Sequence, residues 1–150
     1  MPHTGIHRKG EIDFFGLLSE LRRNLPEDVG AIGCFIGVVR GVSEGKEKVV
    51  WLKYESAEED AAKTLHNIAE DFEKREGIKK VMIHHIIDAL KPGEDAIYVL
   101  VAGRGRKDVF RALEEIMDRV KVEALVWKKE VTESREYWSY EIRESKDSAH

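Results

Sequence analysis

The stretch that decides the fold is IYVLVAGRGRKDVFRALEEIMDRVKVEALVWKKEV, residues 97–131. The apolar run over residues 97–101 is typical of a buried strand, and it leads into the glycine-containing loop 103–107. Apolar residues at helical spacing then predict a helix over residues 107–121, and residues 122–131 predict another strand. Strand, loop, helix and strand in this order indicate a helix that packs across a sheet.

The segments on either side extend this pattern. Helical spacing predicts a helix over residues 11–25, which Pro26 ends, and a second helix that begins with Ser56 and Glu59 as a capping box and ends at Gly77. Strands are predicted at residues 30–40, 49–54, 80–87, 95–102 and 137–142, with a hairpin turn at 91–94. The order α-β-β-α-β-β-α-β-β favours an α+β fold, a mainly antiparallel sheet with packed helices, over a doubly wound parallel fold.

Length and composition set limits on the class of protein. With 150 residues, 42% of them hydrophobic, we expect one soluble domain, frayed at residues 1–5 and 144–150. The net charge of -4 argues against nucleic-acid binding. No apolar run approaches the roughly 20 residues that cross a bilayer, and residues 1–10 lack the apolar stretch of a signal peptide. We therefore expect a cytoplasmic protein that binds neither nucleic acid nor membrane.

Basic residues gather where the helix of residues 107–121 should begin. Arg104, Arg106 and Lys107 lie at the positive end of the helix dipole, which disfavours cations unless an anion is held there. A strand, a glycine-containing loop and a helix start can cradle a phosphate group. The loop lacks the glycine pattern of a dinucleotide fingerprint and the ending of a P-loop. It is either an anion site or a solvated basic turn.

Two lysines further along have different surroundings. Lys121 falls at the C-terminal end of the helix, where a cation suits the dipole. Lys128 would continue a line of apolar strand positions 122, 124 and 126, so it needs a partner or a role. Two lysines that converge on one pocket favour each other's neutral form, which acid–base or nucleophilic chemistry requires. Arg40, at the end of the strand 30–40, points either into the same pocket or to solvent.

Other reactive residue types give weaker signals. Cys34 is the only cysteine and lies in an apolar run, so we expect a small core residue. His84 and His85 are neighbours on a predicted strand and point to opposite faces, which argues against shared metal ligation and predicts one core and one exposed histidine. The sequence has no metal-binding or serine-hydrolase motif, and we expect neither a metal nor a cofactor.

Five stretches of the sequence can be compared with a known family: GCFIGVVR at residues 33–40, LKYE at 52–55, IHHIIDALKPGE at 83–94, IMDRVK at 116–121 and VWKKE at 126–130. In this order they resemble the large, catalytic subunit of molybdopterin synthase. The most specific feature is the pair of lysines seven residues apart, one ending IMDRVK and the other within WKKE. The likeness extends over residues 6–142, and it implies an α/β-hammerhead, an α+β fold with a small β subdomain.

The resemblance also implies an activity and partners. Members of this family convert the cyclic pyranopterin monophosphate precursor into molybdopterin by installing two dithiolene sulfurs. The donor is the C-terminal Gly-Gly thiocarboxylate of a small ubiquitin-like subunit, and two large subunits form a homodimer within a heterotetramer. By position, Lys121 and Lys128 resemble the catalytic residues, and the residues that resemble the substrate-binding positions are Val38, Val39, Arg40, Arg104, Gly105, Arg106, Lys129 and Glu130.

This sequence departs from the family pattern at two places. Members carry His-Arg where this chain has Gly105-Arg106, and Arg104 cannot replace a histidine in proton chemistry near pH 7. At a second place where the family pattern has His-Arg, this chain has His85-Ile86. Asp88 follows at a position where glycine is common.

These departures leave two alternatives open. One is a diverged, non-catalytic paralogue that still binds the ubiquitin-like partner, and the other is an unrelated phosphate-ligand binding protein. Arg143 of a second subunit is a further candidate for completing the pocket.

Overall fold

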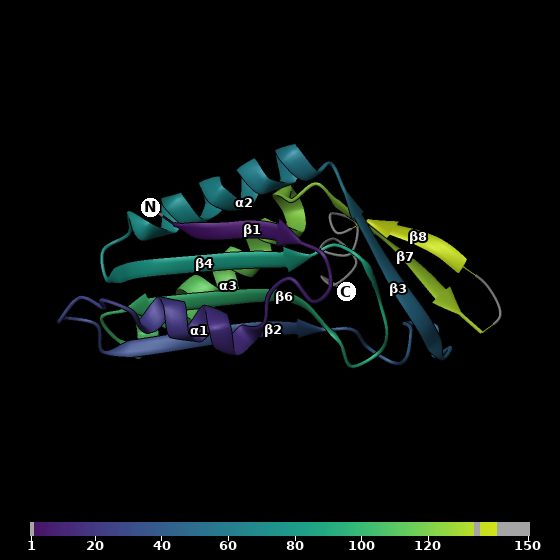
Figure 1. Cartoon of the computed structure of the whole chain (residues 1–150), viewed down its shortest axis with the longest axis horizontal. Coiled ribbons are helices and arrows are strands. Elements are labelled where there is room, and N and C mark those ends of the chain that lie inside the picture. The colour runs from purple at the N-terminus through teal and green to yellow at the C-terminus, as the bar shows by residue number, and fades with distance from the viewer. Residues whose placement is uncertain (1, 134–135, 141–150) are drawn as a thin grey trace.

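Two four-stranded sheets organise the computed structural model, which describes residues 2–133 and 136–140, the last five as backbone alone (Figure 1). The larger sheet has the order β1 (His3–His7), β4 (Ile78–Ile86), β6 (Asp95–Gly103) and β2 (Ala31–Val38). The smaller has the order β5 (Ala89–Leu90), β3 (Val49–Ser56), β7 (Val126–Thr132) and β8 (Glu136–Tyr140). Only β1 and β4 pair in parallel, and the other named pairs are antiparallel.

Helices cover both faces of the larger sheet (Figure 1). α1 (Phe14–Arg22) packs on one face, and α2 (Glu58–Glu73) and α3 (Arg106–Glu123) pack on the other. β4 has apolar side chains on both faces, which suits its place between these helices. Val81 and Ile83 face α2 and α3, whereas Met82 faces α1. No helix within the described ranges is long and apolar enough to cross a membrane.

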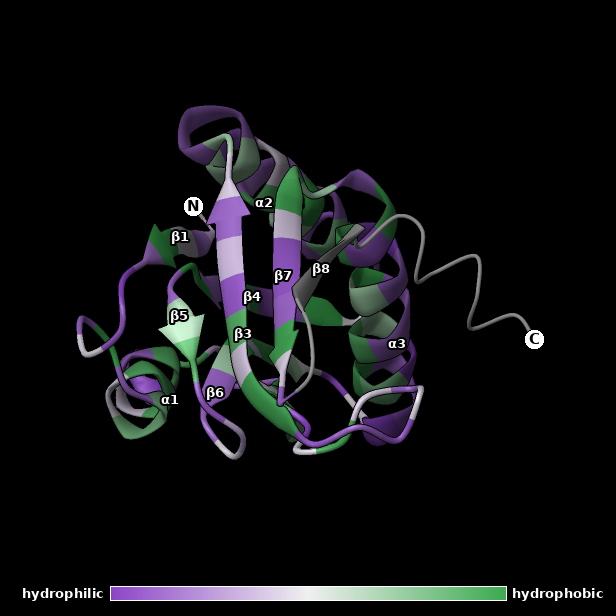
Figure 2. Cartoon of the chain, turned by 90° about the vertical axis from the view of Figure 1, so that its right-hand side faces the viewer, coloured by the Kyte–Doolittle hydropathy of each residue, from purple (hydrophilic) through white to green (hydrophobic). Residues whose placement is uncertain are grey.

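The smaller sheet stands at one end of the larger one, and Figure 2 faces it. The chain connections place it there, because β3 leads directly into α2 and α3 leads directly into β7. β3 and β7 then pair antiparallel, with Tyr54 opposite Lys128. This pairing brings the C-terminal end of α3 and one face of β7 to the same corner of the molecule.

The α+β prediction and its mainly antiparallel sheets are confirmed, with corrections at the helix ends. α3 continues to Glu123 because buried Ala124 caps it, with the Ala124 amide donating to the Val120 carbonyl oxygen at 3.0 Å. Positions 122 and 124 therefore do not lie on the strand of Lys128. The predicted capping box is wrong. Ser56 is the last residue of β3, and its buried Oγ has no hydrogen-bond partner among the residues that the structure describes. Ala57 takes the N-cap position without a side-chain cap.

Two strands were not predicted. β1 has the sequence HTGIH, in which Ile6 is the one strongly apolar residue, and β5 has only two residues. Residues 3–5, expected to be frayed, therefore belong to a strand of the larger sheet. The predicted turn at 91–94 is confirmed, since the Glu94 amide donates to the Lys91 carbonyl oxygen at 3.1 Å. The predicted strand at 137–142 and the frayed tail 144–150 fall partly or wholly outside the described residues.

Three histidines tie β1 to β4. Gly5 lies opposite His84 in the parallel register, and because it has no side chain, the His84 ring fits between His3 and His7. His84 Nε2 lies 2.7 Å from His3 Nδ1, and His84 Nδ1 lies 2.8 Å from His7 Nε2. Burial, together with the neighbouring His3 and His7, lowers the pKa of His84 to about 3.

We predict that His84 makes the protein less stable in mild acid. Its pKa is 6.5 without burial, so the unfolded chain binds more protons than the folded protein between pH 6.5 and about pH 3, and the free energy of unfolding falls as the pH decreases through that range. Urea unfolding at pH 7 and pH 5 should show that His84→Gln removes about 1 to 2 kcal/mol of this loss. His66→Gln is the control, since the side chain of His66 is partly exposed on α2. This variant should lose as much stability between pH 7 and pH 5 as the wild type does. Equal losses in all three proteins would contradict the prediction.

Candidate functional site

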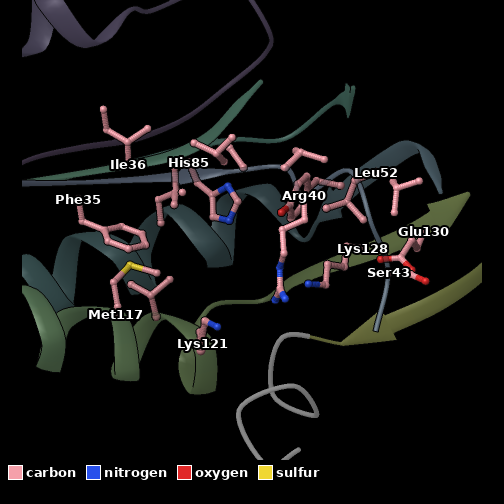
Figure 3. A pocket seen from close by; sticks show the side chains of 18 of the residues that line it. Phe35, Ile36, Arg40, Ser43, Leu52, His85, Met117, Lys121, Lys128 and Glu130 are labelled. Carbon is pink, nitrogen blue, oxygen red and sulfur yellow. The ribbon is translucent and has the colours of Figure 1, made fainter. Parts of the chain in front are cut away.

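A pocket of about 280 Å³ lies at the corner where the smaller sheet meets the end of α3 (Figure 3). The end of β2 and the loop after it form one wall, and β3 and β7 form another. The last two turns of α3 and the facing ends of β4 and β6 complete the lining. The pocket is thus built from segments far apart in the sequence.

Three cationic side chains from three separate segments line this pocket. Arg40 comes from the loop after β2, Lys121 from the last turn of α3 and Lys128 from β7. Figure 3 shows their nitrogen-bearing ends directed toward the same space. The carboxylates in the lining are Glu44 and Glu130, so three positive charges face two negative ones. This corner carries an excess of one positive charge in a chain whose net charge is -4.

The other side of the pocket is apolar. Phe35 of β2 and Met117 of α3 lie together on this wall (Figure 3). Val39 is buried, whereas Val38 is 51% exposed at the rim. The pocket therefore offers a cationic wall and an apolar wall to a single ligand. Within the described residues, His, Cys, Asp and Glu side chains form no group of three that could hold a metal ion.

His85 also lines the pocket, at the end of β4. It is 4% exposed, and its ring packs edge-on against Tyr54, with ring centroids 5.3 Å apart. Burial lowers the pKa of His85 to about 4, and the charge of Lys128 acts in the same direction, so His85 is neutral at pH 7. The prediction of one core and one exposed histidine is wrong, because His84 is also buried, on the opposite face of β4.

Most of the site residues expected from the sequence meet here. Six of them line the pocket: Val38, Val39, Arg40, Lys121, Lys128 and Glu130. Lys129 does not, because alternation along β7 turns it to the other face of the strand, where it lies opposite Lys53 in the register.

The basic loop lies at the other end of α3. Arg106 is the first residue of that helix and Lys121 follows fifteen residues later, which separates them by roughly 22 Å along the helix axis. Arg104 pairs with Glu76 at 3.4 Å, and Gly105 is the N-cap residue without a side-chain cap. Within one chain, Arg104, Gly105 and Arg106 therefore do not line the lysine pocket.

The structure adds lining residues that were not expected in the site from the sequence, among them Phe35, Tyr54, His85 and Met117. Tyr54 lies two residues after Leu52 on a predicted strand, so the strand pattern already places both side chains on one face. Phe35 and Met117 meet only through the packing of α3 beside β2, which no local pattern encodes. Cys34 is exposed rather than buried as expected, because β2 is the edge strand of its sheet.

Curated relatives agree on one family. A family model described as MoaE protein matches residues 7–123. The molybdopterin synthase catalytic subunit of Pyrococcus abyssi is 38% identical over 109 residues, which is 73% of each chain. That of Bacillus subtilis is 36% identical over 111 residues, 74% of this chain and 70% of the relative. A probable molybdopterin synthase of Haloferax volcanii is 34% identical over 75% of this chain, which spans 43% of that longer protein.

Solved structures share the fold. Molybdopterin synthase from Staphylococcus aureus superposes with a TM-score of 0.80 at 30% identity, covering 93% of this chain and 98% of that chain. A chain in a complex of subunits 1 and 2 of the molybdopterin-converting factor from Helicobacter pylori has a TM-score of 0.72, covers 91% of this chain and 89% of its own, and at 18% identity shows likeness of fold alone. The resemblance carried by the lysine motifs is confirmed, and the chain belongs to the MoaE protein family, which includes catalytic subunits of molybdopterin synthase.

Proposed function

We propose that this chain is the catalytic subunit of a molybdopterin synthase and that the pocket of Arg40, Lys121 and Lys128 is its active site. The substrate is cyclic pyranopterin monophosphate, and the product is molybdopterin with its two dithiolene sulfurs. The observation that carries the proposal is the convergence of three cations from three segments on one half-apolar pocket. Relatives of this name match about three quarters of the chain, which supports it.

The two walls of the pocket match the two parts of this substrate. Arg40 and Lys128 provide charge-assisted hydrogen bonds for the cyclic phosphate. Phe35 and Met117 provide apolar contact for the flat ring system. Lys121 stands between these regions, at the end of α3, and serves as the acid–base residue near the carbon atoms that receive sulfur.

Sulfur arrives on the thiocarboxylated Gly-Gly tail of a small ubiquitin-like partner subunit. Each transfer forms a carbon–sulfur bond to the substrate while a carbon–oxygen bond at the same carbon breaks. Opening of the cyclic phosphate, which keeps the oxygen on the phosphate, accounts for one of these bonds, and loss of water accounts for the other. Water then breaks the carbonyl–sulfur bond and supplies the oxygen with which the tail leaves as a carboxylate. The thiocarboxylate and the carboxylate are both anions, so fixed cations in the pocket stabilise the tail before and after transfer.

We further propose a cytoplasmic homodimer that pairs through β2 and carries a small subunit on each copy. β2 is an edge strand, which leaves backbone groups along its outer side available for pairing. It also exposes apolar side chains, with Phe35 and Ile36 each 38% exposed and Val38 51% exposed. Phe110 of α3, which packs beside β2, is 68% exposed. Pairing of two copies would cover this apolar edge.

Such a dimer gives the basic loop a role in the pocket. The Ala31 end of β2 pairs with Gly103, beside the loop of Arg104 and Arg106, whereas the Val38 end lies at the pocket. Antiparallel pairing about a two-fold axis places the Ala31 end of one copy next to the Val38 end of the other. Arg106 of the second copy would then approach the lysines of the first. Arg143, also expected to act from a second subunit, lies outside the described residues.

One alternative keeps the family but not the activity. Membership of the MoaE protein family removes the reading of an unrelated phosphate-binding protein. A non-catalytic paralogue remains an alternative because Gly105 stands where members carry histidine, so the loop has lost its group for proton transfer.

Lys128→Met should weaken sulfate binding to the pocket by about 10-fold to 100-fold, because a hydrogen bond to a charged group contributes roughly 1.5–3 kcal/mol. Calorimetric titration of sulfate at pH 7 measures this. Lys63→Met is the matched control, since Lys63 is an exposed lysine on α2. Equal affinity in Lys128→Met and the wild type would place the anion site elsewhere.

The purified chain should form molybdopterin when it is mixed with the thiocarboxylated small subunit and cyclic pyranopterin monophosphate, with the product measured by mass spectrometry. Lys121→Ala should lower the rate at least about 100-fold, the usual contribution of a positioned acid–base group. Lys63→Ala again serves as the control. Complex formation without any product from the wild-type chain would instead favour the non-catalytic paralogue.

Mixing two inactive variants should restore activity if Arg106 acts across the dimer. Lys121→Ala and Arg106→Ala homodimers should each be inactive, whereas an equimolar mixture refolded or co-expressed should recover about one quarter of the wild-type rate, because half of the dimers carry one intact site out of two. Recovery of no activity, or full activity in Arg106→Ala alone, would contradict a shared site.

A further inference from the structure

We propose that His85 takes up a proton when an anion occupies the pocket beside Lys128. The inference rests on the proposed anion site and adds a titrating residue to it. His85 is a buried imidazole that lines the same pocket as Arg40, Lys121 and Lys128, and none of the roles assigned above uses it. Figure 3 shows its ring directed into the pocket from the end of β4.

Packing fixes the His85 ring close to Lys128. The ring meets the edge of Tyr54 at a centroid distance of 5.3 Å, and Tyr54 is the residue directly opposite Lys128 in the pairing of β3 with β7. Tyr54 thus links the His85 ring of the larger sheet to the Lys128 position of the smaller one. A change of charge at Lys128 or beside it is felt at the ring, because the charge of Lys128 already lowers the pKa of His85.

Hydrogen bonding provides a place for an additional proton on the ring. His85 Nδ1 lies 3.3 Å from the carbonyl oxygen of Ile86, and the backbone carbonyls of Ile86 and Ala96 both favour the protonated ring by raising its pKa. A neutral imidazole has a single N–H group, whereas the protonated ring has two. The protonated ring can therefore donate from Nδ1 to Ile86 and still carries an N–H group at Nε2.

Burial and positive charge keep that proton away while the pocket holds no anion. Burial is the larger cause of the pKa near 4, and Lys128 adds to it, whereas the Ile86 and Ala96 carbonyls act in the opposite direction. The charged and titratable side chains around the ring in the pocket lining are Tyr54, Arg40, Lys121, Lys128, Glu44 and Glu130. A bound dianion would turn the excess of one positive charge into an excess of one negative charge. The balance at His85 then shifts toward the imidazolium.

The other buried histidine differs in each of these respects. His84 faces α1 rather than the pocket, and both of its ring nitrogens already contact histidines of β1. An anion beside Lys128 therefore acts on His85 and not on His84. Proton uptake through His85 would make anion binding stronger as the pH falls from 8 toward 5, since uptake occurs only below the raised pKa of the complex.

Calorimetric titration of sulfate into the full chain tests this proposal, because sulfate keeps its charge of -2 between pH 5 and pH 8. At pH 5.5, the binding enthalpy in two buffers of different ionisation enthalpy should report uptake of about half a proton for each sulfate bound. The uptake should vanish at pH 8. A lysine that gained the proton would give the opposite trend, with uptake growing above pH 8, and that result would overturn the proposal.

Two variants and one spectroscopic measurement complete the design. His85→Phe keeps an aromatic ring against Tyr54 and should bind sulfate without proton uptake, whereas His66→Gln should behave like the wild type. If His85→Phe does not fold, the Cε1 proton resonance of His85 in the wild type reports the same quantity, and its titration midpoint should rise when sulfate is added. If the wild type binds sulfate without proton uptake, or if proton uptake persists in His85→Phe, then the role of His85 is overturned and the anion site stands. Failure of the wild type to bind sulfate overturns the anion site as well.

Discussion

The antiparallel pairing of β3 with β7 is the constraint on which the pocket depends. It runs from Val49 opposite Thr132 to Ser56 opposite Val126. Val49 and Thr132 at one end and Val126 at the other end are buried. A slip by one residue would turn Lys128 and Glu130 to the outer face of the sheet and bring Lys129 inward. The buried Val126 and Thr132 disfavour that slip, so the same apolar contacts that stabilise the smaller sheet also select which lysine reaches the pocket.

The convergence of cations is compatible with a stable fold because each is held by a different rigid segment. Lys121 lies in the last turn of α3, where the negative end of the helix dipole favours it. Lys128 is fixed by the strand register, and Arg40 follows the irregular pairing at the end of β2. Neutral His85 adds no fourth charge at pH 7. An arrangement of this kind suits the anion proposed above, which would relieve the repulsion among the three cations.

The sequence predicted the fold class and six of the residues that line the pocket, and the misses have physical causes. The spacing of apolar residues predicts long amphipathic helices such as α3. β1 lacks apolar alternation, because its parallel partner β4 and a row of histidines stabilise it instead. Lys121 and Lys128 were found because their motifs are local. His85 and Phe35 reach the pocket only through contacts between distant segments, which spacing does not encode.

Arg106 and Lys121 lie at opposite ends of α3. A helix is a rigid rod, so a cation at its first residue and another fifteen residues later lie roughly 22 Å apart and cannot hold one phosphate together. The sequence pattern that suggested one site in fact describes the two ends of α3. If both ends serve the same substrate, they do so in different copies of the chain. Gly105 of each copy then stands beside the pocket of the other copy, so the missing histidine affects both sites of the homodimer.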